Sequence, residues 1–278
     1  MPIVESHVHI WTQDENYPFA PTLPDVPVPT TDATAEMLLE ETGKAGVDHV
    51  VLVQPSTYGW DNRYLADNIA RYPQQLAGVC LVNPLDEQAP EQLEYWVREH
   101  NFHGVRLHAV RPDSASWFTS AQTDRIWRKA ADLGIPICLL LDLVHAPMVE
   151  EMLKRFPEVD VVLDHMGRIN VAEQPPYPVF SRFLELADFP RTYAKVSGML
   201  HYSAEAYPFA DTHPFFRMAK DAWGPQRLMW GTDWPMLLDK AGYLPRLTAV
   251  RDEMPFFSQS DLEWILGGTA LRLWSFAE

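Results

Sequence analysis

Short runs of apolar and β-branched residues alternate along the chain with longer stretches in which apolar positions follow a helical period. Runs of this length and composition are typical of strands covered on both faces, as in a parallel sheet with helices around it. We expect strands at Ile3–His9, His49–Gln54, Ala77–Asn83, Gly104–His108, Ile135–Leu141, Val159–Asp164, Thr192–Val196 and Leu228–Gly231.

The stretches between these runs predict helices, among them Ala33–Lys44, Ala89–His100, Ser120–Leu133 and Pro147–Phe156. Gly46 and Gly134 stand where a helix ends before the next strand, and Pro157 has the same place one element later. After the eighth run, Ser260–Phe276 predicts a closing helix, with Ser260 as its N-cap and Glu263 three residues on.

Eight alternations favour an α/β fold of the closed (β/α)8 TIM-barrel type over a doubly wound sheet, and no GxGxxG motif follows the first strand. The length of 278 residues suits one barrel, which typically needs about 250. We therefore expect a single domain over residues 1–278. The proline-rich segments Tyr17–Pro29 and Gln174–Pro178 are expected to be stiff loops, the first covering one end of the barrel.

The formal charge of −16 argues against nucleic acid or an anionic membrane surface as a partner, because both require a basic face. Cys80 and Cys138 each lie inside an apolar run, as buried, reduced thiols do. The N-terminus has no signal-peptide pattern, and no run approaches the roughly 20 apolar residues of a membrane span. These features predict a cytoplasmic protein.

The histidines gather at one end of the predicted strands. His7, His9, His108 and His165 lie at the C-terminal ends of the first, fourth and sixth strands, and His145 and His201 follow the fifth and seventh. Packing alone gives histidines no preference for one end, whereas the active sites of (β/α)8 barrels lie at the C-terminal ends of the strands. The distribution predicts a catalytic site there.

Strict alternation would place Glu5, His7 and His9 on one side of the first strand, facing the barrel interior. Two imidazoles on one strand can bind one divalent ion, and a nearby carboxylate can complete the ligand set. Asp233 follows the eighth strand, which lies beside the first in a closed barrel. A turn or N-cap role is the alternative for Asp233.

Three motifs resemble those of the amidohydrolase superfamily. Glu5-Ser6-His7-Val8-His9 resembles its opening Asp-x-His-x-His, Leu163-Asp164-His165-Met166-Gly167 its later histidine motif, and Gly231-Thr232-Asp233-Trp234-Pro235 its terminal Gly-[ST]-Asp-Trp-Pro. Their order is most similar to the branch that contains decarboxylases and lactonases. The resemblance implies an amidohydrolase-like TIM barrel with one divalent ion bound by Glu5, His7, His9, His165 and Asp233.

The chain departs from the superfamily pattern at two points. Glu5 replaces the usual aspartate, and no lysine ends the fourth or fifth strand, where two-metal relatives have a bridging carboxylated lysine. One ion is therefore expected, with Zn2+ the best match to histidine and aspartate ligands and Mn2+ also compatible. Some lactonases of this branch work without metal, so a metal-free site remains an alternative.

The resemblance implies hydrolysis of a lactone, with Asp233 as general base and His165 beside it. Arg106 and Arg168 are candidates to bind substrate carboxylates, and His108, Tyr58 and Trp234 to line the pocket. The alternative for each arginine is a structural salt bridge. The expected partner is a small anionic molecule, and a homo-oligomer is compatible. Decarboxylation, lactone isomerisation and a catalytically silent binding barrel remain alternatives.

Overall fold

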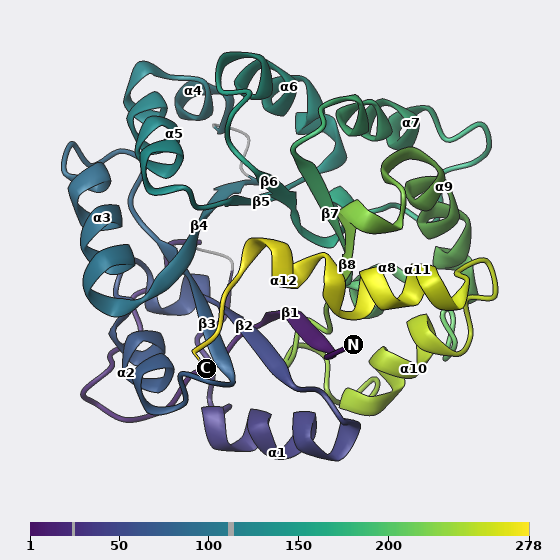
Figure 1. Cartoon of the computed structure of the whole chain (residues 1–278), viewed down its shortest axis with the longest axis horizontal. Coiled ribbons are helices and arrows are strands. Elements are labelled where there is room, and N and C mark those ends of the chain that lie inside the picture. Colours follow the sequence, from purple (N-terminus) through teal and green to yellow (C-terminus); the bar gives the residue numbers. More distant parts are fainter. Residues whose placement is uncertain (24–25, 111–113, 278) are drawn as a thin grey trace.

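The computed structural model describes residues 1–23, 26–110 and 114–277, and its centre is an eight-stranded parallel sheet (Figure 1). The strands pair in chain order, each with the next, so every connection between neighbours is a βα crossover. They are β1 Val4–Val8, β2 His49–Val53, β3 Leu76–Leu81, β4 Phe102–Ala109, β5 Ile137–Leu141, β6 Val161–Leu163, β7 Thr192–Val196 and β8 Leu228–Trp230. All eight predicted strands are present, with ends that differ from the prediction by at most two residues.

The barrel closes between β8 and β1 through the residues that follow β8. Val8 forms a parallel bridge with Trp234. Asp233 N–H donates to the His7 carbonyl at 2.9 Å, and His9 N–H donates to the Trp234 carbonyl at 2.8 Å. The predicted (β/α)8 barrel is therefore confirmed.

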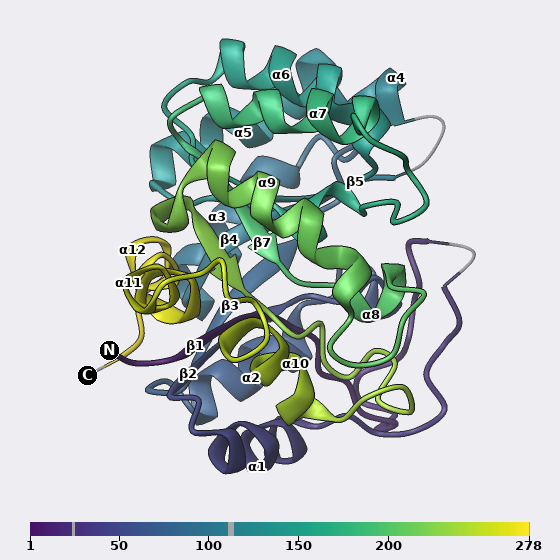
Figure 2. The same ribbon diagram turned by 90° about the vertical axis from the view of Figure 1, so that its right-hand side faces the viewer.

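Helices surround the barrel (Figures 1 and 2). Thr34 caps α1 through its side chain, and Gly46 and Gly134 end α1 and α5 in the left-handed conformation, with φ of 72° and 65°. Those two stops agree with the prediction. The helices are α1 Ala35–Ala45, α2 Arg63–Arg71, α3 Ala89–His100, α4 Ser114–Phe118, α5 Ala121–Leu133, α6 Ala146–Arg155, α7 Pro178–Leu184, α8 Met199–Tyr202, α9 His213–Trp223, α10 Tyr243–Arg251, α11 Gln259–Glu263 and α12 Ala270–Leu273.

The closing segment differs from the single helix predicted at Ser260–Phe276. It consists of α11, a π-helical turn at Trp264–Gly268, and α12. Its N-cap is Ser258, because the Ser258 side chain accepts from the Asp261 N–H and the Asp261 side chain accepts from the Ser258 N–H. The segment covers the N-terminal end of the barrel, opposite the ends where the histidines lie (Figure 2).

The core has two layers, one inside the barrel and one between the barrel and the helices. The inner layer contains side chains from β1, β2, β3, β5, β6 and β8 and is closed below by α12 and the residue after it: Val4, Val51, Val53, Ala77, Val79, Cys138, Val162, Met229, Ala270 and Trp274. Cys80 and Cys138 are both buried and free, as predicted. Within the described residues, no helix combines the length and apolarity that crossing a membrane requires.

A bulge interrupts the alternation of β1. Glu5 pairs with Val50 and Val8 with Leu52, so three steps along β1 match two steps along β2. Val50 and Leu52 both belong to the outer layer. Glu5 and Val8 therefore face the helices, while His7 and His9, on either side of Val8, face the barrel interior. The prediction that Glu5 shares their side was wrong, because strict alternation does not survive an extra residue.

Part of the proline-rich loop Tyr17–Pro29, residues 24 and 25, lies outside the described residues. The described part of this loop reaches the C-terminal end of the barrel, because Leu23 and Val26 line the pocket there.

Candidate active site

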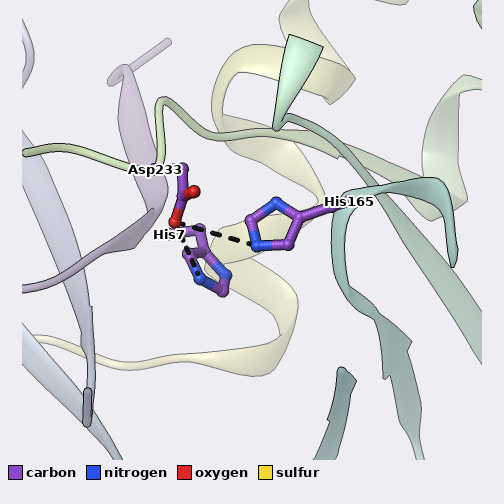
Figure 3. Close-up of side chains that lie close together, drawn as sticks. All are labelled: His7, His165 and Asp233. Carbon is purple, nitrogen blue, oxygen red and sulfur yellow. Dashed lines mark ion pairs between the residues drawn. The ribbon is translucent and has the colours of Figure 1, made fainter. Parts of the chain in front are cut away.

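His7, His165 and Asp233 meet at the C-terminal ends of β1, β6 and β8 (Figure 3). Each is buried and offers one ligand atom, and these atoms lie within 4.8 Å of one another. His7 belongs to β1, His165 to the turn that follows β6, and Asp233 to the segment after β8. The structure thus brings together, at the predicted end of the barrel, residues that are far apart in the sequence.

Asp233 is held by its backbone and by four imidazoles. Its φ of 60° lies in the left-handed region, which short polar residues tolerate better than most. Asp233 Oδ1 lies 3.3 Å from His9 Nε2, 3.6 Å from His7 Nε2 and 3.8 Å from His165 Nε2. Asp233 Oδ2 pairs with His201 Nε2 at 2.7 Å.

Asp233 remains a carboxylate at neutral pH. Burial favours its protonated form, but the neighbouring imidazoles of His165, His201 and His9 outweigh burial and hold the pKa of Asp233 well below its usual range. Burial lowers the pKa of His165 to about 4, so the carboxylate faces a neutral imidazole there.

The tautomer of His9 shows what the cluster can bind. His9 Nδ1 lies 2.7 Å from the Val53 carbonyl, which can only accept, so Nδ1 carries the hydrogen. In the neutral ring the lone pair of His9 Nε2 faces Asp233 Oδ1 at 3.3 Å, and two acceptors repel each other unless a cation or a proton lies between them. His165 Nδ1 lies 2.9 Å from Ser197 Oγ, a hydroxyl that can donate or accept, so this contact orients the ring without fixing its tautomer. This donor set fits a divalent cation at Asp233 Oδ1.

A second layer of charges lies around His7. Asp164 Oδ1 lies 3.3 Å from His7 Nδ1, the position of a carboxylate that orients a metal-binding imidazole. Lys195 Nζ lies 2.9 Å from the same nitrogen and 3.0 Å from Asp164 Oδ1, and Arg106 Nε donates to Asp164 Oδ2 at 2.8 Å. If His7 Nδ1 donates to Asp164, His7 Nε2 presents a lone pair. If Nδ1 instead accepts from Lys195, Nε2 carries the hydrogen.

The charges of this layer interact in a buried environment. Burial raises the pKa of Asp164, but Lys195, His7 and Arg106 together hold it well below its usual range. Burial and the nearby Lys195 lower the pKa of His7 well below its usual range, so the ring is neutral at pH 7. His7 Nε2 has no hydrogen-bond partner among the described residues, and it faces Asp233.

Glu5 lies outside this cluster, contrary to the predicted ligand set. Its Oε1 accepts from the N–H groups of His7 at 3.0 Å and Thr232 at 2.9 Å, and its Oε2 lies 3.1 Å from the Tyr243 hydroxyl. Burial raises the pKa of Glu5 to about 7. Gly231 allows this arrangement, because a Cβ there would lie 2.9 Å from His7 Cβ and 3.2 Å from Glu5 Oε1.

A pocket of about 530 Å³ opens above the cluster, and we call it the main pocket. Its polar wall is formed by His9, Arg106, His165, Arg168, His201 and Asp233. Arg168 Nη1 forms an ion pair with Asp142 at 2.9 Å and is 43% exposed, so the predicted binding arginine stands at the rim. Arg106 lines the main pocket, as expected of a residue that binds substrate. It is also buried and forms an ion pair with Asp164, as expected of a structural salt bridge.

Three other predicted pocket residues lie elsewhere. The Tyr58 hydroxyl binds the backbone of Thr12, and its ring stacks on Phe19, so Tyr58 belongs to the core that holds the first loop. Trp234 is buried in the outer layer. His108 lines a neighbouring cavity instead of the main pocket. Tyr58 and Trp234 were predicted to line the pocket, but both side chains pack in the apolar core instead.

The sequence-based site lacked Lys195 and His201, which are in contact with its members. A signal existed for each. Lys195 is a charged residue within a buried strand, and His201 follows the end of a strand by a few residues. His201 was expected at this end of the barrel with the other histidines, but neither its contact with Asp233 nor that of Lys195 with His7 follows from the sequence alone.

The chain belongs to the amidohydrolase family, whose model matches residues 4–276. Among curated relatives, an L-fucono-1,5-lactonase of Burkholderia ambifaria is 27% identical and is matched over 84% of this chain and 80% of its own length. A 2-pyrone-4,6-dicarboxylate hydrolase of Comamonas testosteroni is 27% identical over 84% of this chain and 76% of its own. A D-galactarolactone isomerase of Agrobacterium fabrum is 25% identical over 68% of this chain and 62% of its own.

Solved structures share the fold across the whole chain. A probable 2-pyrone-4,6-dicarboxylic acid hydrolase of Acinetobacter baumannii, with citric acid bound, has a TM-score of 0.83 and 21% identity over 98% of this chain and 99% of its own. An amidohydrolase of Burkholderia multivorans, with zinc bound, has a TM-score of 0.83 and 22% identity over the full length of both chains. A 5-carboxyvanillate decarboxylase of Sphingomonas paucimobilis has a TM-score of 0.68 and 15% identity, over 99% of both chains.

Proposed function

We propose that this protein is a lactonase, which opens the ring of a small lactone that carries a carboxylate. The observation that carries the proposal is the Asp233 carboxylate, which remains ionised and has one oxygen at the convergence of three imidazoles beside two arginines of the main pocket. The lactone-hydrolysing relatives support it, since they match most of the chain.

Asp233 is the general base in this proposal. Its Oδ1 removes a proton from the attacking water, the water oxygen forms a bond to the lactone carbonyl carbon, and the ring C–O bond breaks. Asp233 then returns the proton to the alkoxide, which leaves as a hydroxyl. His201 holds Oδ2 at 2.7 Å, so it fixes the orientation of the carboxylate and keeps Oδ1 toward the imidazoles.

The residues that would hold a divalent ion are His7, His165 and Asp233, with His9 at the edge of the group. When bound, the ion polarises the lactone carbonyl and lowers the pKa of the attacking water toward about 7. We propose Zn2+, because neutral imidazoles and a carboxylate suit it best, with Mn2+ also compatible. The zinc found in the Burkholderia multivorans relative agrees with this choice.

Arg106 and Arg168 are proposed to bind the anionic part of the substrate. Both line the main pocket together with His165 and Asp233, so a carboxylate at either arginine lies close to the reacting carbonyl. A planar guanidinium binds a carboxylate through two parallel hydrogen bonds, which would fix the lactone against the base.

The alternatives use the same barrel and differ in the products. A lactone isomerase needs the same base without net uptake of water, and one relative has that activity. Decarboxylation is the other alternative, and the sequence feature that favours it is Glu5 in place of the usual aspartate. Glu5 lies on the opposite side of β1 and contacts the backbone of His7 but not the rings of the cluster, so it lends this alternative no support.

The test is a panel of lactones, including sugar-acid lactones and carboxylated unsaturated lactones, assayed between pH 6 and 9 by acid release. Mass spectrometry of the products should show the addition of one water. Carbon dioxide release would indicate a decarboxylase, and an isomer of unchanged mass would indicate an isomerase. Turnover of no compound in the panel would count against the lactonase.

A further inference from the structure

A second cavity of about 120 Å³ lies beside the main pocket, and we call it the side cavity. Its wall includes Trp60, the loop after β3, the end of β4 and Trp117 of α4. Arg106 and Leu23 line both cavities, so the two are neighbours and the Arg106 side chain lies at their boundary.

The side cavity is largely apolar and in part exposed. Trp60 is 38% exposed and Leu85 is 60% exposed, although both are large apolar side chains, and both line this one cavity with Trp117. Water bound against such walls finds few polar partners. An apolar group that replaces this water gains free energy in proportion to the surface that it covers.

His108 is one of the polar residues on this wall, together with Thr22, Asn83 and Arg106. The His108 side chain is more than nine-tenths buried, and its Nε2 has no hydrogen-bond partner among the described residues. Burial and the nearby Arg106 hold the pKa of His108 well below its usual range, so the ring is neutral. It can form one hydrogen bond to a hydroxyl, ether or carbonyl group, and it offers no charge to a second carboxylate.

The volume limits what can enter. A cavity of about 150 Å³ lined by apolar side chains accommodates benzene, so 120 Å³ suits a flat ring or a short branched alkyl group. A chain of free hydroxyls would leave most of its hydrogen bonds unmade against Trp60, Leu85 and Trp117.

We propose that the side cavity is a substrate subsite, which receives a ring-sized apolar substituent next to the carboxylate that Arg106 binds. The inference rests on the proposed lactonase function and narrows the substrate class to aryl- or alkyl-substituted lactone acids, as opposed to polyhydroxylated sugar lactones.

The first experiment compares three lactones that share the carboxylate: 5-oxotetrahydrofuran-2-carboxylate, its 2-phenyl derivative, and D-glucaro-1,4-lactone. The wild-type kcat/KM should be at least about tenfold higher for the phenyl compound than for the other two, because only its phenyl group can cover the apolar wall. An equal or lower value for the phenyl compound overturns the proposal.

The second experiment removes apolar surface from the rim. Leu85→Ser should lower kcat/KM for the phenyl lactone by about fivefold and change that for the unsubstituted lactone by less than about twofold. Leu244→Ser is the matched control, because Leu244 is also an exposed leucine, 49% exposed, on α10 and away from both cavities. A Leu85→Ser variant that affects both lactones equally contradicts the subsite.

Binding separates this inference from the lactonase itself. Calorimetry should show 3-phenylpropanoate binding at least about tenfold more tightly than propanoate, with the difference reduced in Leu85→Ser. This result without turnover of any lactone would retain the subsite and reject the lactonase. Lactone turnover with no preference for phenyl in either assay would retain the lactonase and reject the subsite.

Discussion

Asp233 shows how one short side chain can be fixed for chemistry. Its backbone is left-handed, its N–H is bound to the His7 carbonyl, and each carboxylate oxygen has its own imidazole neighbours. Asparagine has nearly the same shape and also tolerates this backbone conformation. The substitution therefore removes the charge with little disturbance of the fold.

Asp233→Asn should lower kcat by about 10²–10⁴, as the loss of a general base does, with little change in melting temperature. Steady-state kinetics on the best lactone of the panel measures this. Asp239→Asn is the control, because Asp239 is an exposed aspartate in the same segment. Activity of Asp233→Asn within about threefold of wild type would remove Asp233 from its proposed role.

Arg106 contacts a buried carboxylate on one side and lines the pocket on the other. Arg106→Ala should raise KM for an anionic lactone while kcat changes less, because a carboxylate contact contributes mainly uniform binding. It should also lower the melting temperature, because Asp164 loses a charged partner in a buried place. A lower melting temperature with unchanged KM would show that Arg106 is structural only.

Lys195 acts on His7 from beneath, and its ammonium both repels a cation at the site and competes with Asp164 for His7 Nδ1. Lys195→Met should therefore bind Zn2+ at least about tenfold more tightly in competition with a chromophoric chelator. It should also melt at a lower temperature, because Asp164 keeps fewer partners.

Lys220→Met is the control for this change. Lys220 of α9 also forms an ion pair, with Asp261 of α11, and neither residue lines the main pocket. Its loss should affect the melting temperature and leave the Zn2+ affinity unchanged. Weaker Zn2+ binding by Lys195→Met would mean that the lysine assists the cation site.

The sequence predicted the residues of the cluster that follow strand ends, because the position of a strand end is a local property. It placed His201 at this end of the barrel, but it could not predict the contact of His201 with Asp233 or that of Lys195 with His7, since both depend on which strands meet across the barrel. The burial of Tyr58 and Trp234 in the core could not be predicted for a related reason. An aromatic side chain near a motif can pack either in the apolar core or against the wall of the ligand pocket. The packing of segments that are distant in the sequence determines which of the two it does.

At the scale of elements, the bulge in β1 decides which side chains enter the barrel. It turns Glu5 toward α10 and leaves His7 and His9 facing inward. The hydrophobic pattern predicted the extent of β1 to within one residue at each end. Every residue of this strand is buried, however, so no alternation of buried and exposed positions marks the place of the bulge. The positions of the eight strands could be predicted from the sequence, but the shifted register between β1 and β2 could not.

Glu5 makes the bulge sensitive to pH. Its pKa is about 7 in the folded protein, above the usual 4.5, so the folded state binds more protons than the unfolded state between these values. The contribution of Glu5 to stability is therefore full at low pH and is lost as pH rises through about 7. The loss is up to about 3 kcal/mol.

Glu5→Gln resembles the protonated acid and removes this dependence. The free energy of unfolding of Glu5→Gln minus that of wild type should be larger at pH 8 than at pH 5, as measured by urea denaturation at both pH values. Glu15→Gln, at an exposed position, is the control. A difference that is the same at both pH values would show that Glu5 is ionised throughout this range.

At the scale of the whole molecule, the candidate metal site lies across the seam where the barrel closes. The other neighbouring strands pair over several residues, whereas β8 meets β1 through one bridge and a few hydrogen bonds of the residues after β8. His7 and Asp233 lie on the two sides of this seam, and His165 adds the turn after β6. An ion bound there would connect parts of the chain that are more than 200 residues apart.

Zn2+ should therefore stabilise the whole barrel. An ion that binds only the folded state adds about 2.7 kcal/mol at 100 times its Kd, which corresponds to a rise in melting temperature of roughly 5 °C for a protein of this size. Calorimetry on chelator-treated protein with Zn2+ added back measures the shift, with Mg2+ as the control cation. Asp233→Asn and His165→Ala should each reduce the shift, because each removes a ligand. A melting temperature that does not respond to Zn2+, together with full lactone hydrolysis in the chelator, would rule out the ion and leave Asp233 and the imidazoles to activate water alone.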